Sequence, residues 1–297
     1  MMNGQDRIGF VGVGRMGANM ARRLKDTGYD LVGIYDSVET LAESLAEELE
    51  CDVCANPAEI ADRVDIIFTV VTNDSAMRMI FDPDAPLSLV QHAQGRIFIN
   101  CATVSPRIHQ DIEQWINTRG GESLEACMAS SITQAREGTL YLMCGGKRQV
   151  FERVKPILND LSVALRYVGP AGEAAKVKAL VNMVMNANTV ALAEGLGLGA
   201  ALGVDIQMLR EIFSQTGAAS RVLETDGADM EARDHECYFS AEHAAKDSRI
   251  ALTLAEEMGL NLPVAKATSE QYQCLLEVGK GHLDKSAIAE LTFPGRL

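Results

Sequence analysis

Apolar and polar residues follow two different patterns along the chain. In residues 1–167, short apolar runs typical of buried strands are separated by segments with helical periodicity. From residue 168 onward only helical patterns remain. Strands that alternate with helices are typical of a doubly wound, mostly parallel sheet. We therefore predict an α/β domain in residues 1–167 and an all-helical domain in residues 168–297.

The individual elements follow from the same pattern. Apolar runs predict strands at residues 7–11, 30–35, 64–71, 96–100, 124–128, 139–144 and 165–168. After residue 205, helical periodicity covers residues 206–213, 240–258 and 263–277. Residues 221–239 are charged and poor in aromatic side chains, so we predict a surface loop with a short helix there.

Residues 169–205 read as one long helix that no proline interrupts after its first turn. Apolar side chains on nearly every face predict that it is buried. Roughly 28 residues at about 1.5 Å rise would span about 42 Å, enough for an interdomain helix. Gly195, Gly197 and Gly199 each cost about 1 kcal/mol relative to alanine in a helix. They indicate either close approach of another helix or a local break.

A glycine-rich turn joins the first strand to the next helical segment. Gly12, Gly14 and Gly17 enclose Arg15 and Met16 in the sequence GVGRMG. In such a turn the first glycine permits the bend, the second lets the backbone approach a pyrophosphate, and the third lets the helix pack on the strand. The helix N-terminus then faces the phosphates. This pattern predicts a dinucleotide site.

An acidic residue strengthens that prediction. Asp36 follows the second strand, about 19 residues after Gly17, where a carboxylate can accept hydrogen bonds from ribose hydroxyls. Its structural alternative, an N-cap for the next helix, is compatible with this role. Asp36 would repel a 2′-phosphate, and neither Ser37 nor Val38 offers a positive charge. We therefore predict NAD(H) as the preferred cofactor, with NADP(H) as the alternative.

Two further loops follow strand ends of the kind that line a cofactor crevice. Val71 and Thr72 come after the strand at residues 64–71, and Thr103 lies in the small, polar loop after residues 96–100. On the long helix, Lys178 and Asn182 are four residues apart and project from one face. A lysine within an apolar helix suggests a function, although a lysine can also extend its ammonium to the surface and do nothing.

The overall charge limits the partners. A formal net charge of −14 argues against binding to nucleic acid or anionic lipid, which needs clustered lysine and arginine. The first residues do not resemble a signal peptide, and no uncharged apolar run is long enough to span a membrane. We expect a cytoplasmic protein with reduced thiols. Cys51 and Cys54 form a single CxxC without a second pair of ligands, so we expect no metal site.

With these features in place, the chain resembles the β-hydroxyacid dehydrogenase family over essentially its whole length. The glycine turn matches, and the loop at residues 100–106 is similar to the family's D-x-S-T-x-x-P. Gly138-Thr139-Leu140 matches a G-T-L that ends a substrate loop. The family's catalytic lysine, with an asparagine one turn later, falls on Lys178 and Asn182. A later Lys-Asp pair falls on residues 246 and 247.

The resemblance implies a Rossmann domain, an NAD(P) cofactor, and interconversion of a small β-hydroxy acid with its semialdehyde by a homodimer or homotetramer. It implies that Lys178 transfers a proton and that Asn182 and Thr103 orient the substrate. Lys246 would complete the pocket beside the cofactor, and Asp247 would reach the substrate. Ser130 and Ser131 fall on the family's substrate loop.

The sequence departs from the family at several positions that bear on the substrate. The family usually has Asp and Ser at the first and third positions of the residue 100–106 loop, S-G-G in the substrate loop, and in many members Asn before the catalytic asparagine. Here these positions hold Asn100, Ala102, Ala129, Ser130, Ser131 and Val181. We therefore expect hydride chemistry, but a substrate unlike that of ordinary members.

Three other functions stay open from the sequence. The segment Gly14-Arg15-Met16-Gly17-Ala18-Asn19 also resembles the start of 6-phosphogluconate dehydrogenase, which decarboxylates a phosphorylated sugar acid. Against it, no basic cluster for a substrate phosphate is evident. An imine reductase shares the expected fold, although such enzymes commonly lack the lysine. The third alternative is a sensor that binds a nucleotide through the glycine turn but catalyses no reaction.

Overall fold

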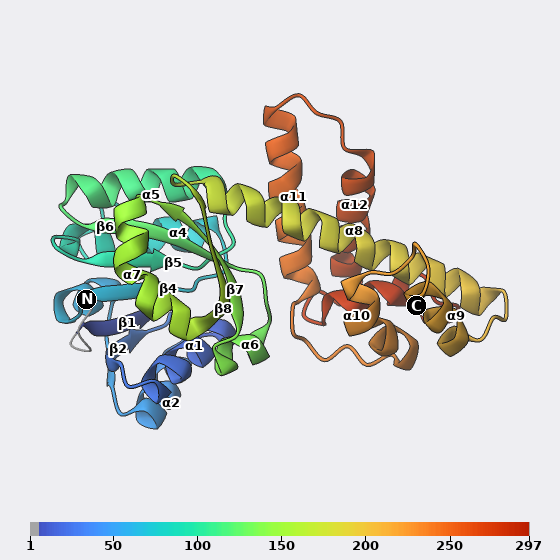
Figure 1. Ribbon diagram of the computed structural model, residues 1–297, viewed down its shortest axis with the longest axis horizontal. Helices are drawn as coiled ribbons and strands as arrows, with labels where there is room; N and C mark the ends of the chain where they lie inside the picture. Colours follow the sequence, from blue (N-terminus) through green and yellow to red (C-terminus); the bar gives the residue numbers. More distant parts are fainter. Residues whose placement is uncertain (1–5, 297) are drawn as a thin grey trace. The chain divides into compact units, whose positions relative to one another are not determined.

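The computed structural model describes residues 6–296, and its chain separates into two compact units (Figure 1). The N-terminal unit is Met1–Lys178, and the C-terminal unit is Ala179–Leu297. One eight-stranded sheet forms the N-terminal unit, in the order β3-β2-β1-β4-β5-β6-β7-β8. Only the β6–β7 pair among these strands is antiparallel. The predicted doubly wound, mostly parallel sheet and the helical C-terminal region are confirmed.

The strands of the N-terminal unit are β1 Arg7–Val11, β2 Asp30–Tyr35, β3 Asp52–Val53, β4 Ile66–Thr69, β5 Ile97–Asn100, β6 Glu122–Met128, β7 Leu140–Gly146 and β8 Ser162–Gly169. Its helices are α1 Arg15–Asp26, α2 Glu39–Leu49, α3 Pro57–Arg63, α4 Asp74–Ile80, the 3₁₀ helix η1 Leu89–His92, α5 Pro106–Thr118, α6 Ile132–Glu137 and α7 Arg148–Leu161. The short strand β3, helices α3 and α6 and the 3₁₀ helix η1 were not predicted.

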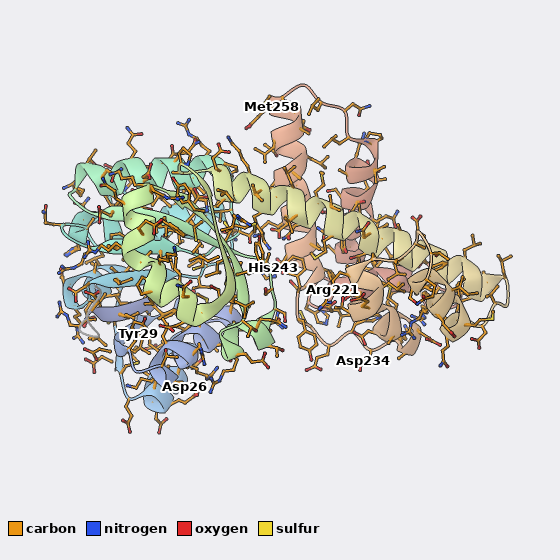
Figure 2. All side chains as sticks on the ribbon, viewed as in Figure 1. Asp26, Tyr29, Arg221, Asp234, His243 and Met258 are labelled. Carbon is orange, nitrogen blue, oxygen red and sulfur yellow. The ribbon has the colours of Figure 1, made fainter. Side chains whose placement is uncertain are left out.

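Successive strand residues point to opposite faces of the sheet, and each face has its own apolar core. Phe10 packs with α1, α2, α6 and α7, whereas its neighbour Val11 packs with α3, α4, η1 and α5. On the first face, Tyr29 after α1 donates its hydroxyl to Asp160 of α7 at 2.7 Å, and Arg136 of α6 pairs with Asp26 of α1 at 2.5 Å. Figure 2 labels Tyr29 and Asp26. Helices on both faces therefore bury the sheet.

The strands around β1 end level with one another. Val11 pairs with Tyr35 of β2 and with Thr69 of β4, and Thr69 pairs with Asn100 of β5. After β1 the chain builds β2 and β3 on one side and then returns to place β4 on the other. This reversal is a topological switch point, where ligands bind in the crevice beyond the carboxyl ends of the strands.

The C-terminal unit is helical. Helix α8, Glu173–Ala201, starts within the N-terminal unit, and α9 Ile206–Ser214, α10 Arg221–Ala232, α11 Ala241–Glu257, α12 Pro263–Glu277 and the 3₁₀ helix η2 Lys285–Leu291 follow. The predicted surface loop with a short helix at residues 221–239 contains helix α10, which is 12 residues long and covers more of this segment than expected. Its charged Asp226 is buried and pairs with Lys285, so polar composition concealed an inward-facing helix.

Helix α8 runs unbroken for 29 residues through its three glycines. A Cβ added at Gly197 would lie 2.9 Å from the backbone oxygen of Thr292, and one added at Gly199 would lie 2.5 Å from the Leu209 side chain. Of the two explanations for these glycines, close approach of other segments is therefore confirmed. A membrane-crossing helix is absent from residues 6–296, where no helix is sufficiently long and apolar.

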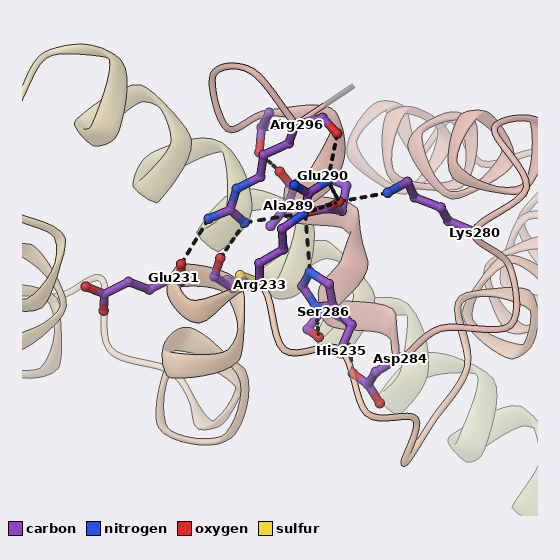
Figure 3. A network of polar contacts seen from close by, with 11 residues as sticks. Glu231, Arg233, His235, Lys280, Asp284, Ser286, Ala289, Glu290 and Arg296 are labelled. Carbon is purple, nitrogen blue, oxygen red and sulfur yellow. Dashed lines mark hydrogen bonds and ion pairs between the residues drawn. The ribbon is translucent and has the colours of Figure 1, made fainter.

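A buried carboxylate organises the end of the C-terminal unit (Figure 3). Glu290, 2% exposed, lies 2.7 Å from Lys280 Nζ and 2.8 Å from Arg233 Nη2, with Arg296 Nη1 at 3.5 Å. His235 Nε2 is 3.6 Å from its other oxygen. Burial alone would raise the pKa of Glu290, but its bonds to Lys280 and Arg233 outweigh burial and lower it. The ionised form therefore stabilises this unit.

We predict that Glu290→Gln lowers the free energy of unfolding by about 3 kcal/mol at pH 7, because three cations lose their buried partner. A carboxylate whose pKa is lower in the folded than in the unfolded chain stabilises the fold at pH values above its unfolded-state pKa. That stabilisation disappears as pH falls through its folded-state pKa. The gap between wild type and variant should thus shrink below about pH 4.5. Urea unfolding of both proteins at a series of pH values measures this difference in free energy of unfolding.

The control is Glu224→Gln, which removes an exposed pair with Arg221 and should cost less than about 1 kcal/mol. Equal stability of Glu290→Gln and wild type at pH 7 would contradict the role assigned to Glu290.

Candidate active site

The glycines of the turn after β1 have different environments. A Cβ added at Gly12, whose φ is +91°, would lie 2.5 Å from the backbone oxygen of Val70. A Cβ added at Gly17 would lie 2.2 Å from the backbone oxygen of Gly12. At Gly14 no heavy atom of the described chain lies within 4 Å of an added Cβ. The fold itself requires Gly12 and Gly17, whereas Gly14 leaves open space for a ligand.

Helix α1 begins directly at this open space. Its N-cap is Gly14, which offers no side-chain cap, and Arg15 and Met16 form the first turn. Backbone N–H groups of a first helical turn and the helix dipole both favour an anion. The turn therefore fits the pyrophosphate of a dinucleotide.

Asp36 holds the turn from the end of β2. Its carboxylate accepts hydrogen bonds from the Val13 N–H at 2.7 Å and from the Val38 N–H at 2.9 Å. Asp36 does not act as the N-cap of α2, because that helix begins at Glu39 with Val38 at the N-cap. The side chain remains partly accessible beside the exposed Ser37, so the same carboxylate can also accept ribose hydroxyls.

The other predicted cofactor residues lie at the same edge of the sheet. Val71 and Thr72 follow β4, and Thr103 follows β5. The two loops are tied together, because Asp74 accepts hydrogen bonds from both the N–H, at 2.8 Å, and the hydroxyl of Ser105. The structure thus gathers the residues from four strand ends, namely Gly12, Gly14, Arg15, Met16, Gly17, Asp36, Ser37, Val71, Thr72 and Thr103.

Asn100, a departure from the family, has a structural partner on each side. It is fully buried, accepts a hydrogen bond from the Thr69 hydroxyl at 2.7 Å and donates one to the Ser123 hydroxyl at 2.9 Å. This chain links β4, β5 and β6. Ala102 is also buried and belongs to the apolar core.

The two serines of the predicted substrate loop bind their own backbone. Ser131 is the N-cap of α6 and forms a capping box with Gln134. The Ser130 hydroxyl accepts a hydrogen bond from the Tyr141 N–H at 3.0 Å and donates one to the Ala129 carbonyl at 2.8 Å. These contacts order the loop, and direct substrate contact by either serine stays a prediction.

Helix α8 carries the predicted catalytic residues. Lys178 is 8% exposed and Asn182 is 1% exposed. The Asn182 amide nitrogen donates to Asp247 of α11 at 2.5 Å, and Lys246 Nζ lies 3.1 Å from the other Asp247 oxygen. One turn further along α8, Asn186 also binds α11, through a backbone carbonyl and a hydroxyl, each at 3.0 Å. Asp247 thus holds the Asn182 amide in place from α11.

Glu125 fixes the start of α8, a role that was not predicted from the sequence. Its carboxylate, 2% exposed on β6, accepts hydrogen bonds from the N–H groups of Gly172 and of Ala175, the latter at 2.9 Å. Burial raises the pKa of Glu125 to about 7, against the opposing effect of these two bonds. The detectable signal was an acidic residue within an apolar strand. Glu125 positions the helix that carries Lys178.

The glycine turn at the switch point of a doubly wound sheet defines a dinucleotide-binding protein. Comparison with known proteins agrees with this class. Residues 7–169 match the family model described as the NAD binding domain of 6-phosphogluconate dehydrogenase. Residues 172–292 match the model described as the NAD-binding region of NADP-dependent 3-hydroxyisobutyrate dehydrogenase.

Individual relatives match over nearly their whole length. Glyoxylate/succinic semialdehyde reductase 1 of Arabidopsis thaliana is 28% identical over 284 residues, 95% of this chain and 97% of the relative. The 2-hydroxy-3-oxopropionate reductase of Escherichia coli is 28% identical over 286 residues, 96% of each. A solved structure of Mycobacterium tuberculosis 3-hydroxyisobutyrate dehydrogenase with L-serine has the same fold, with a TM-score of 0.86, 23% identity, and coverage of 96% of this chain and 98% of that one.

The chain belongs to the β-hydroxyacid dehydrogenase family and is an NAD(P)-dependent oxidoreductase. The predicted family, cofactor class and enzyme class are confirmed.

We predict that Gly14→Ala folds normally but binds NADH at least about 10-fold more weakly, because its methyl group enters the open space. Gly17→Ala should instead lower the unfolding temperature, since its Cβ meets backbone. Gly217→Ala, also in open space but in the C-terminal unit, is the control and should leave NADH affinity unchanged. Fluorescence titration with NADH and thermal unfolding measure both effects. Unchanged NADH affinity in Gly14→Ala would remove this turn from the cofactor site.

Proposed function

We propose that the protein reduces a small semialdehyde to the corresponding β-hydroxy acid and catalyses the reverse oxidation, with NAD(H) preferred. The names of the two curated relatives support this substrate class. The observation that carries the mechanism is Lys178, a buried lysine on α8 with Asn182 one turn later.

When bound, the nicotinamide cofactor supplies the hydride that reaches the aldehyde carbon. Lys178 donates a proton to the aldehyde oxygen during reduction and accepts it from the alcohol during oxidation. Glu125 fixes the first turn of this helix and so places the backbone from which the lysine side chain extends. A positioned proton donor is worth more than a mobile one, because the reacting atoms are already aligned.

Asn182 would steady the substrate oxygen. Its amide nitrogen carries two hydrogens, and the bond to Asp247 occupies one of them. We infer that the second is donated to the substrate. Asp247 then acts as a positioning residue for Asn182, and Lys246 balances its charge. Thr103 retains the hydroxyl expected to hold the substrate carboxylate.

The substrate itself stays a proposal. Glyoxylate, succinic semialdehyde and 2-hydroxy-3-oxopropionate, named for the relatives, are the first compounds to screen. Decarboxylation of a phosphorylated sugar acid, imine reduction and a sensor without turnover are less favoured. The same screen with 6-phosphogluconate and a cyclic imine separates them.

We also propose a cytoplasmic protein that forms a homodimer or homotetramer. Leu180, Val184 and Leu198 on α8 and Leu202 directly after it have exposed apolar side chains. Leu180 and Leu198 are 18 residues apart, which equals about five helical turns, so they lie on the same face of the helix. Exposed apolar side chains of this kind favour association with a second chain.

We predict that wild type uses NADH with at least about 10-fold higher kcat/KM than NADPH, because Asp36 repels the 2′-phosphate. Asp36→Asn should reduce that preference by about 10-fold, since it removes the charge and keeps an oxygen for the Val13 N–H. Asp30→Asn, at the opposite end of β2, is the control. A wild-type preference for NADPH would overturn the cofactor assignment.

We predict that Lys178→Ala binds NADH normally but loses about 10²–10⁴ in kcat, because the positioned proton donor is absent. Lys178→Met keeps most of the side-chain volume and should show the same loss, which separates chemistry from packing. Asn182→Ala should lose less, since it removes a hydrogen bond and leaves the proton donor. Steady-state kinetics and NADH titration measure these effects.

Lys176→Ala, on the exposed face of α8, is the control and should keep wild-type kcat. If wild type turns over a semialdehyde and Lys178→Ala retains its kcat, the assigned mechanism is wrong. If wild type binds NADH but reduces neither aldehyde nor imine, the result favours the non-catalytic sensor over the enzyme.

A further inference from the structure

Three side chains with metal-ligand chemistry meet in the N-terminal unit, away from the glycine turn. His109 comes from α5, and Glu125 and Cys127 come from one face of β6, two residues apart. One ligand atom of each lies within 4.8 Å of the others. The sequence prediction of no metal site rested on spacing along the chain, which cannot detect ligands from two elements. We propose that His109, Glu125 and Cys127 form a zinc site.

The arrangement is close to that of a bound ion. With zinc at about 2.3 Å from sulfur and about 2.0–2.2 Å from nitrogen or oxygen, tetrahedral ligand atoms lie about 3.3–3.7 Å apart. The ligand atoms therefore need to approach one another by at most about 1.5 Å for an ion to bind. The three residues provide three of four ligands, and solvent is the usual fourth ligand of such a set.

His109 is an unpartnered polar group aimed into this cluster. It is 1% exposed, and neither ring nitrogen makes a hydrogen bond within the described chain. An unsatisfied buried polar group is costly, and a bound ion would supply the partner that the imidazole lacks.

Charge and donor type favour zinc over other ions. Zn²⁺ bound to a thiolate, a carboxylate and a neutral imidazole makes a cluster of zero net charge, which suits a buried site. On binding, the Cys127 thiol releases its proton to solvent as the Zn–S bond forms. Nitrogen and sulfur donors exclude Ca²⁺ and Mg²⁺, which take oxygen. Each Glu125 oxygen accepts one backbone N–H and retains a lone pair for the ion.

The position of the cluster gives the ion a structural effect. Cys127 packs against Ala174 in the first turn of α8, and Glu125 binds that same turn. A bound ion would link α5, β6 and the start of α8. Because this link exists only in the folded chain, zinc should raise the stability of the N-terminal unit.

The test uses the full chain after dialysis against a chelator, titrated with Co²⁺ alone and with Zn²⁺ alone. Wild type should bind one Co²⁺ per chain with a thiolate-to-metal absorption band. At Zn²⁺ concentrations about 100 times Kd, its unfolding temperature should rise by about 5 °C. Cys127→Ser should weaken binding more than about 100-fold and abolish the band. His109→Phe removes an unsatisfied group, so it should fold at least as stably as metal-free wild type while losing the zinc effect.

Two variants act as controls. Cys144→Ser removes a buried thiol from the adjacent strand β7, and Cys51→Ser removes half of the CxxC. Both should retain the cobalt band. The proposal is wrong if wild type shows no band, or if the band persists in Cys127→Ser or disappears only in Cys51→Ser. Enzymatic turnover does not enter this test.

Discussion

The hydrogen bonds from Glu125 to the first turn of α8 are the constraint on which the candidate site depends. They join a buried strand of the sheet to the helix that carries Lys178. About two turns further along, Asn182 donates a hydrogen bond to Asp247, so the helix backbone is held both before and after Lys178. A buried lysine on a fixed backbone suits proton transfer, because the proton donor is already placed before the reaction.

The cofactor half of the site has a different origin, in the level ends of four parallel strands. Because Val11, Tyr35, Thr69 and Asn100 are paired in register, the loops that follow them share one edge. Gly12 and Gly17 are needed for the turn itself, and Asp36 both shapes that turn and supplies its negative charge. The residues proposed to bind the cofactor thus also determine the shape of the turn.

Local patterns in the sequence predicted the strands, the long helix and the glycine turn, because these features depend on neighbouring residues. They did not predict contacts between distant segments. Glu125 binds backbone 47 residues away, and His109 meets Cys127 only after α5 packs on β6. The length and the buried face of helix α10 were not predicted for a related reason: its acidic Asp226 pairs with Lys285, 59 residues later. Likewise, the cross-strand role of Asn100 required knowledge of the strand order.

The central claim is that the protein catalyses hydride transfer to a semialdehyde carbon. The most direct measurement is reduction by wild type of the best semialdehyde from the screen, with NADH deuterated at C4 of the nicotinamide, followed by mass spectrometry and NMR of the product. We expect one deuterium at the new alcohol carbon, transferred from one face of the nicotinamide. A product alcohol without deuterium at that carbon for either C4-labelled form, or NADH oxidation without alcohol, would contradict the account.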